Sequence, residues 1–454
     1  METSSSITEG DINISAERLK WNREITDQST LRILEDDARY FLHQSMSSPC
    51  LEVLESCKGS EIKTLSGKHI LDFHGNNVHQ LGYGNEVVIG QILKQLSSLS
   101  FSPRRYTNEP AVELAKKLAS LLPGDLNRSL FAPGGTSAIS MALKLARVVT
   151  GKHKLVSLWD SFHGASLDTI SAGGEAIFRK HMGPMLPGVV HIPPPTTFRG
   201  IFGDSEEDLL KYADYLEYVI EKEGDIGAFL AETIRNTDVQ IPSKSYWQRI
   251  REICTKHEVL LILDEIPIAL GRTGKLFAFE HFEIEPDILC LGKGLGGGII
   301  PFAAMITRDR YNVAGDISLG HFTHEKSPLG SVAALATLNY IENENLLQKV
   351  TEDEQWFGNE LLRLKDKYPE IGDIRGKGLL WGVELVKSRE TKEKASELAE
   401  KIMYDCMRRG LSFKVSQGNV LQLSPALTIS RQDLEKAIAI LTTAFENNTL
   451  QFEN

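Results

Sequence analysis

Cysteine is scarce in this chain, and the cysteines present do not form a recognisable framework. There are five in 454 residues, an odd number, and none forms a CxxC pair. We therefore expect free thiols in a reducing compartment rather than a disulfide scaffold or a metal site.

A basic surplus and a long apolar run are also lacking. Because 50 basic side chains face 61 acidic ones, the net charge of −11 leaves no cationic excess for nucleic-acid phosphates. No apolar run is long enough to cross a bilayer, and residues 1–15 are polar, with no basic segment leading into an apolar core. These absences predict a cytoplasmic protein that binds neither nucleic acid nor membrane.

The rest of the composition is that of an ordinary globular protein. Hydrophobic residues make up 41% and charged residues 24% of the chain. A chain of this length buries a large core and is expected to divide into a large and a small domain. We place an N-terminal segment at 1–75, a large domain at 76–335 and a C-terminal small domain at 336–454.

Strand-like and helix-like segments alternate along the chain. Residues 259–264 read Val-Leu-Leu-Ile-Leu-Asp, the continuous apolar run typical of a parallel strand covered on both faces. The pattern predicts an α/β fold. Strands are expected at 59–66, 70–73, 130–132, 154–159, 227–232 and 259–264, and helices at 15–43, 109–121, 137–149, 340–366 and 391–409.

Three features in the middle of the chain fit one cofactor. Lys293 lies between glycines, which let a reactive amine approach a cofactor aldehyde closely. Asp264 ends a buried strand, where a carboxylate can keep a pyridine nitrogen protonated. The turn Gly134-Gly135-Thr136 opens a helix, whose N–H groups and dipole favour a phosphate. Each feature alone is more common as a simple turn, but together they indicate pyridoxal phosphate (PLP).

The same residues carry a family resemblance. Residues 260–304, with Asp-Glu-Ile-Pro and Leu-Gly-Lys-Gly, resemble the signature of class III (ω-type) aminotransferases. Similar segments lie near residue 65, at 106–124, at 161–164 and at 371–385, so the resemblance covers roughly 50–440. It implies PLP-dependent fold type I, with a mainly parallel sheet of the seven-stranded type. A smaller α+β domain would be formed by the N- and C-terminal segments.

The resemblance also implies roles for single residues. Lys293 would carry the cofactor and act as the proton-transfer base, and Asp264 would pair with the pyridinium. Thr323 would reach the phosphate of a neighbouring subunit, which implies a homodimer with shared sites, or a tetramer. The remaining cofactor contacts would come from Gly135, Thr136, Phe162, His163 and Glu232, and no metal is expected.

Two departures from the family pattern lie around the cofactor. Ile266-Pro267 follow Asp-Glu where the family has Val-Gln, and proline has no amide side chain and no backbone donor. The phosphate turn reads Gly-Gly-Thr-Ser rather than Ser-Gly-Thr-Glu, which removes one hydroxyl and one carboxylate.

A third departure bears on the substrate. The family's Leu-Arg-Phe-x-Pro, whose arginine grips a substrate carboxylate, is Leu-Gln-Leu-Ser-Pro here, so Gln422 replaces that clamp. Arg104 and Arg105 are the basic candidates for gripping a different anion, followed by Lys326 and Lys414. His79 and His321 are better interpreted as structural hydrogen-bonding residues.

Three functions are therefore considered. A lyase would remove a proton and a leaving group from a small anionic amine and needs no keto acid, which suits Gln422. Segments such as Thr-His-Glu-Lys-Ser-Pro (323–328) most resemble the subfamily of ammonia-lyases that act on (R)-1-hydroxy-2-aminoethylphosphonate, yielding phosphonoacetaldehyde and ammonia in phosphonate breakdown. The alternatives are an ω-aminotransferase and a non-catalytic PLP-fold module. Retention of Lys293, Asp264 and Thr323 argues against the module.

Overall fold

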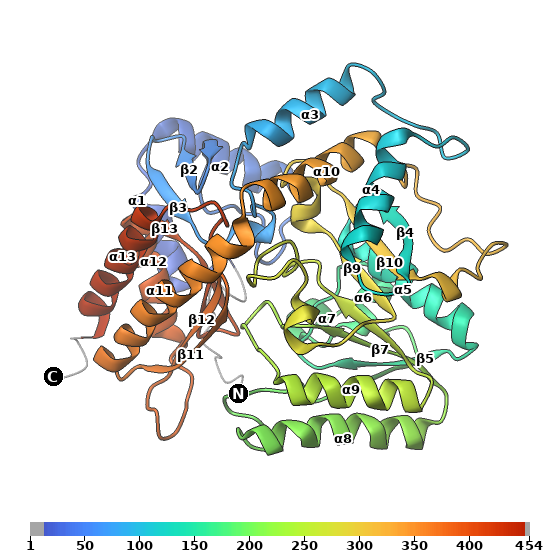
Figure 1. The fold of residues 1–454 in the computed structure, drawn as a ribbon. Helices are drawn as coiled ribbons and strands as arrows, with labels where there is room; N and C mark the ends of the chain where they lie inside the picture. Colours follow the sequence, from blue (N-terminus) through green and yellow to red (C-terminus); the bar gives the residue numbers. More distant parts are fainter. Residues whose placement is uncertain (1–12, 450–454) are drawn as a thin grey trace. The chain divides into compact units, whose positions relative to one another are not determined.

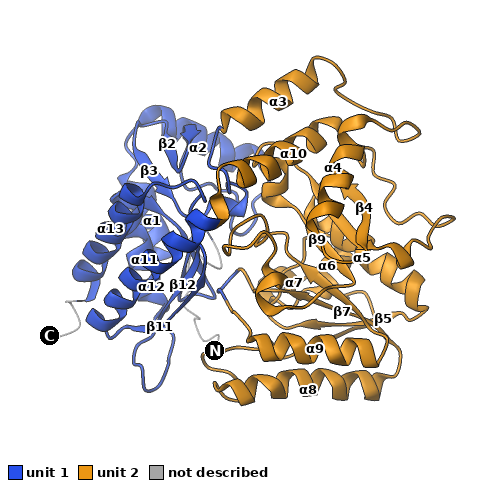
Figure 2. Ribbon diagram, in the orientation of Figure 1, with its two compact units in different colours: residues 1–84, 237–239, 348–454 blue, residues 85–236, 240–347 orange. Residues whose placement is uncertain are grey.

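The computed structural model describes residues 13–449 (Figure 1). Within this range the chain forms two compact units (Figure 2). Unit 1 contains residues 13–84, 237–239 and 348–449, and unit 2 contains 85–236 and 240–347. The domain limits placed at 75 and 335 remain predictions. Most of the polar N-terminal stretch considered above, residues 1–12, lies outside the described range.

Unit 2 is built around a seven-stranded sheet. The strand order is β4-β10-β9-β8-β7-β5-β6, and β10 runs antiparallel to both of its neighbours while the other pairings are parallel. This sheet confirms the predicted fold class. The strands are β4 (Leu126–Ala132), β5 (Lys154–Leu158), β6 (Val189–Ile192), β7 (Ile226–Glu232), β8 (Leu260–Asp264), β9 (Ile288–Leu291) and β10 (Ala303–Arg308).

The central strands are apolar because they are buried along their whole length. Every residue of β7, β8 and β9 is buried. Helix α5 (Gly135–Thr150) packs on β7, β9 and β10, and α9 (Lys244–Lys256) packs on β8. Helix α9 also packs on α8 (Glu206–Glu223), and the two lie side by side in Figure 1. The other unit 2 helices are α3 (Glu86–Leu96), α4 (Glu109–Leu121), α6 (Leu167–Ala172), α7 (Ala176–Arg179) and α10 (Pro328–Asn343).

Unit 1 contains two smaller sheets. In one, the order is β1-β2-β3-β13, from β1 (Leu54–Lys58), β2 (Glu61–Thr64), β3 (His69–Asp72) and β13 (Leu411–Ser412). In the other, the order is β11-β12-β15-β14, from β11 (Ile371–Lys377), β12 (Leu380–Leu385), β15 (Val420–Leu423) and β14 (Lys414–Ser416). The helices are α1 (Ala16–Glu24), α2 (Gln28–Tyr40), α11 (Leu346–Lys367), α12 (Ser396–Arg408) and α13 (Arg431–Thr449).

Two predicted helices are each divided in the structure, and the helix predicted at 391–409 begins only at Ser396. The helix predicted over 15–43 is wrong as one element, because Ile25 is extended and Asp27 caps a second helix through the Thr30 amide at 2.7 Å. The helix predicted over 340–366 is also two helices, because Asn345 adopts a left-handed backbone with φ +49° between α10 and α11.

All five cysteines lie in the described range and are free thiols; Cys254, Cys290 and Cys406 are buried, and Cys50 and Cys57 are exposed. Among residues 13–449, every helix is too short or too polar to span a membrane.

Candidate active site

The site residues of unit 2 gather where parallel strands end. Glu232 is the last residue of β7 and pairs in register with Asp264, the last residue of β8. Asp264 in turn pairs with Cys290 of β9. Strand β9 ends at Leu291, and Lys293 lies two residues beyond that end. In sheets of this kind, ligands bind beyond the carboxyl ends of the strands. The structure therefore brings Glu232, Asp264 and Lys293 to one edge of the sheet.

Asp264 is fixed by two hydrogen bonds. Its Oδ2 lies 2.8 Å from Nδ1 of His163, and its Oδ1 accepts the Ile266 amide at 3.0 Å. Because a carboxylate can only accept, His163 carries its proton on Nδ1 in this contact. The Nε2 atom of His163 is buried and has no hydrogen-bond partner among the described residues. A buried polar atom of this kind at the sheet edge is consistent with a polar ligand in the site.

Glu232 is a buried carboxyl beside this pair. Burial raises the pKa of Glu232; His163 opposes that shift, and the nearby Asp264 adds to it. Its two oxygens accept the Phe162 amide at 3.3 Å and the Asn236 amide at 3.0 Å. Glu232 therefore holds the backbone of the segment that carries both Phe162 and His163.

Phe162 itself lies in the loop after β5. Its ring is half-buried and packs against Phe178 of α7, with ring centroids 4.5 Å apart. An aromatic ring held in this way offers an apolar face of the kind that stacks on a planar heterocycle.

The start of α5 provides an anion-binding end. The N-cap residue of this helix is Gly134, which has no side chain to accept a hydrogen bond from the first backbone N–H groups. A methyl group on Gly135 would lie 2.8 Å from Cδ1 of Ile266, and one on Gly292 would lie 3.1 Å from Cγ2 of Ile266. Ile266 thus packs the phosphate-type turn against the segment that carries Lys293.

The Thr136 hydroxyl belongs to a cluster of hydroxyl groups. It lies 2.7 Å from Oγ of Ser166 and 2.9 Å from Oγ1 of Thr169. Ser166 donates to Asp168 and Thr169 donates to the Ser166 carbonyl, so the Thr136 proton is directed to this cluster. Burial works against the ionised form, but hydrogen bonds from Ser140, Ser166 and the Thr169 amide lower the pKa of Asp168.

Lys293 has an uncommon backbone conformation. Its φ is +46°, a left-handed value that costs free energy for a residue with a side chain. It opens a short 3-10 helix (Lys293–Gly296), and Gly297 with φ +68° ends that helix. The lysine is half-buried. Such strain is common at functional sites.

The other predicted residues of unit 2 lie on two neighbouring loops. Arg104 and Arg105 are in the loop between α3 and α4, and Thr323 is exposed in the loop before α10. The two loops are joined because Asn108 Nδ2 donates to the Lys326 carbonyl at 2.9 Å, and the rings of Phe101 and His324 meet edge to face at 5.2 Å.

Gln422 belongs to unit 1. It is a buried residue of β15, opposite Gly382 on one side and Lys414 on the other. Lys414, the other basic candidate near the C-terminus, is therefore the cross-strand neighbour of Gln422.

Sequence reasoning missed two parts of this site. Ile266 was noted only as a departure, although it contacts both glycine segments, because packing between distant residues leaves no local pattern. Asp168 was not singled out at all, but Ser166 directly before a short helix is a capping signal that could have indicated it.

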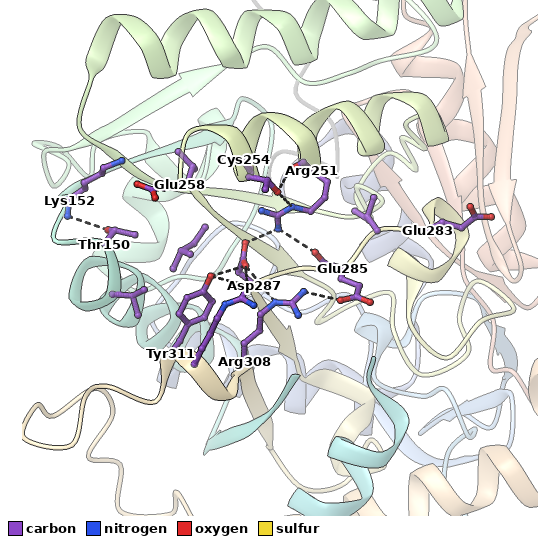
Figure 3. A pocket seen from close by; sticks show the side chains of 16 residues that line it. Thr150, Lys152, Arg251, Cys254, Glu258, Glu283, Glu285, Asp287, Arg308 and Tyr311 are labelled. Atoms are coloured by element: carbon purple, nitrogen blue, oxygen red, sulfur yellow. Dashed lines mark hydrogen bonds and ion pairs between the residues drawn. The ribbon is translucent and has the colours of Figure 1, made fainter. Parts of the chain in front are cut away.

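A separate cavity of about 840 Å³ lies at the other end of the same strands (Figure 3). Asp287 accepts hydrogen bonds from Arg251 at 2.7 Å and from the Tyr311 hydroxyl at 3.1 Å, and Arg308 pairs with Glu285 at 3.0 Å. Because these charges are matched within the protein, we interpret this network as structural.

A lysine beyond a central strand, a carboxylate at the next strand end, an aromatic ring and an uncapped helix start together define a PLP enzyme of fold type I. The class-III aminotransferase model matches residues 43–445, and the chain belongs to this family of PLP-dependent enzymes.

Similar proteins include the (R)-1-hydroxy-2-aminoethylphosphonate ammonia-lyase of Vibrio splendidus, 57% identical over 98% of this chain and 96% of the relative. A Bacillus anthracis aminotransferase superposes with a TM-score of 0.86, 30% identity and coverage of 93% and 100% of the two chains. An amine transaminase from an uncultivated Pseudomonas species, solved with PLP bound, superposes with a TM-score of 0.85 and 27% identity, and the match covers 90% of this chain and 99% of the transaminase.

Proposed function

We propose that this enzyme is a PLP-dependent ammonia-lyase that converts (R)-1-hydroxy-2-aminoethylphosphonate to phosphonoacetaldehyde and ammonia, as part of phosphonate breakdown. The observation that carries the proposal is the 57% identity, over nearly the full length of both chains, to a lyase of that name. The site geometry and the replacement of the carboxylate clamp by Gln422 support it.

The cofactor would be held by residues whose chemistry suits each part of it. Asp264, with its orientation fixed by His163, would pair with the ring nitrogen, and Phe162 would cover the ring face. Gly135 and Thr136 would offer backbone N–H groups to the phosphate. The Thr136 hydroxyl reaches a phosphate oxygen only by giving up a hydrogen bond to Ser166 or Thr169.

The reaction itself would depend on Lys293. When bound, PLP withdraws electrons from the carbon that bears the substrate amine. Nζ of Lys293 would take the proton from that carbon and pass it to the hydroxyl on the next carbon, which would leave as water. Nζ of Lys293 would then take back its place on the cofactor aldehyde, and the product would leave as an enamine. The enamine becomes an imine, and addition of water yields the aldehyde and ammonia. Atoms balance, because the water lost in elimination is regained in hydrolysis.

A basic group is needed for the phosphonate of the substrate. We propose Arg104 or Arg105 for this role, because guanidinium groups bind phosphonate-like oxygens in a bidentate manner. Their loop is tied to the loop of Thr323 through Asn108. Each arginine would be replaced in turn by methionine: the change at the arginine that holds the phosphonate should raise the KM for the substrate and leave PLP affinity unchanged.

The alternative function is that of an ω-aminotransferase, supported by the transaminases among the solved structures of similar fold. It requires a keto-acid partner, for which unit 1 offers the neutral Gln422 in place of an arginine. That substitution favours the lyase.

A homodimer with shared sites is proposed as well. Leu93 and Leu96 of α3, and Tyr106 in the following loop, expose large apolar surfaces of the kind that a second copy would cover. Thr323 is exposed in its own chain, which suits a contact with a neighbouring subunit. Sedimentation velocity should give twice the chain mass; a monomer at micromolar concentration would contradict the proposal. The free thiols suit the cytoplasm.

The deciding assay mixes PLP-loaded enzyme with (R)-1-hydroxy-2-aminoethylphosphonate and no keto acid. Sustained release of ammonia and aldehyde in equal amounts is expected. A single turnover that ends in pyridoxamine phosphate would instead identify a transaminase.

A further inference from the structure

A short stretch of chain leaves one unit and returns. Residues 237–239 belong to unit 1, whereas the residues on both sides of them belong to unit 2 (Figure 2). The stretch is the tip of a hairpin, because Arg235 and Gln240 exchange backbone hydrogen bonds of 3.0 and 3.1 Å. We refer to residues 235–240 as the 235–240 loop.

Arg375 of β11 grips the tip of this loop. Its Nε donates to the carbonyls of Asp238 at 3.0 Å and Val239 at 2.9 Å, and its Nη2 donates to the Asp238 carbonyl at 2.6 Å. The remaining nitrogen, Nη1, pairs with Glu384 at 2.7 Å and Asp373 at 2.9 Å. Two carboxylates therefore orient the guanidinium through Nη1, and the edge formed by Nε and Nη2 binds two backbone carbonyls.

Val239 shows that the loop tip is held under strain. It is fully buried and has φ +57°, a conformation that is a true outlier for a β-branched side chain. A methyl group on Gly382 would lie 3.1 Å from Cβ of Val239, so the valine is packed closely onto β12. Strain of this kind persists only where the surroundings over-determine the conformation.

The 235–240 loop also contacts a residue of the candidate site. Asn236, adjacent to the gripped tip, donates its backbone N–H to Oε2 of Glu232 at 3.0 Å. The other oxygen of Glu232 accepts the Phe162 amide. Thr233 donates its hydroxyl to Glu265 at 2.8 Å. A continuous series of contacts thus runs from Arg375 through the loop to the segment of Phe162 and His163.

We infer that Arg375 is a positioning residue for the cofactor site, acting through the 235–240 loop on Glu232. The inference rests on the proposed assignment of Phe162 and His163 to the cofactor. The grip would hold the Asn236 amide on Glu232, and so keep the aromatic ring and the imidazole in place before the cofactor arrives.

The test uses Arg375→Lys. Lysine keeps the charge that Glu384 and Asp373 require, but its ammonium cannot bind two carbonyls and two carboxylates in a planar fork. The matched control is Lys377→Met, which removes another cation of β11, one paired with Glu354 at 3.2 Å and without a contact to the loop.

Three readouts should move together. PLP affinity should fall roughly tenfold in Arg375→Lys, the size of coupling that packed networks carry. In the same variant the pH dependence of the bound cofactor's absorbance should differ from that of the wild type. Hydrogen exchange of the backbone amides of residues 233–240 should also become faster. Lys377→Met should match the wild type in all three.

An unchanged PLP affinity and spectrum in a folded Arg375→Lys would overturn the inference and leave Arg375 a structural residue of unit 1. Equal weakening by Lys377→Met would overturn it too, because the effect would then be general. Failure of the wild type to release ammonia would sink the proposed function without touching these measurements, since they need no substrate.

Discussion

Ile266 lies so close to Gly135 that the glycine has no room for a side chain. A methyl group there would lie 2.8 Å from Cδ1 of Ile266, closer than real carbon contacts allow. The same isoleucine limits Gly292 through Cγ2. One side chain therefore sets the spacing between the start of α5 and the segment of Lys293.

Gly135→Ala should weaken PLP binding, because Ile266 must move or the helix start must shift. We expect PLP binding to lose about 1–3 kcal/mol of free energy, the usual cost of inserting a methyl group into a filled site. Adding Ile266→Val removes the Cδ1 atom and should restore part of the affinity, measured by absorbance titration of the apoenzyme. Purely additive effects of the two changes would show that this contact is not the cause.

Lys293→Ala should lower turnover by about three orders of magnitude, because the proton-transfer base is lost. PLP should still bind, more weakly and without a covalent link, which its absorbance spectrum would show. Lys275→Ala is the control, since Lys275 is an exposed lysine of unit 2 that lies outside its helices and strands. Turnover retained in Lys293→Ala would remove this lysine from the mechanism.

Glu265 should make stability depend on pH. Burial raises the pKa of Glu265 to about 7, although Ala278, Phe279 and Thr233 all donate hydrogen bonds to it, against 4.5 without these surroundings. The folded state therefore binds the Glu265 proton more tightly than the unfolded state does. The stability that this proton contributes is complete below pH 4.5 and is lost as the pH rises through about 7.

The comparison is with Glu265→Gln, which stays neutral at every pH. Between pH 5 and pH 8 the wild-type apoenzyme should lose stability relative to this variant, by on the order of 3 kcal/mol at most. Melting temperatures of both proteins across this range provide the measurement. Parallel curves would mean that Glu265 does not titrate there.

Gln422→Arg should introduce the missing carboxylate clamp. The variant should convert glutamate and PLP to 2-oxoglutarate and pyridoxamine phosphate faster than the wild type, as followed by absorbance. Lys414 lies directly opposite on β14, and like charges opposite one another are destabilising. The double variant with Lys414→Gln should therefore be more stable than Gln422→Arg alone. Wild-type enzyme that already reacts rapidly with glutamate would contradict the interpretation of Gln422.

The parts of the fold that follow local rules could be predicted from sequence. The apolar run at 259–264 is strand β8, and the capped, periodic segment at 109–121 is helix α4. Asp264 and Lys293 could be singled out because strand ends and glycine-flanked turns leave a local pattern.

Contacts between distant residues could not be predicted in this way. Nothing near Arg375 in the sequence indicates that its partners are the carbonyls of residues 238 and 239. The bond between His163 and Asp264 likewise joins residues about a hundred positions apart, whose relation only the sheet order establishes. The break of the first helix at Asp27 was missed because Asp27 was not read as a cap.

The parallel pairing of β13 with β3 has a consequence for biosynthesis. Leu411 pairs with Leu71 and Ser412 with Asp72, so the first sheet of unit 1 needs strands from both ends of the chain. While the ribosome is still making the C-terminal part, the nascent β3 has an open edge, whereas all seven strands of unit 2 have already emerged. Unit 2 can therefore fold during translation, and the sheet of unit 1 closes only when synthesis is nearly finished.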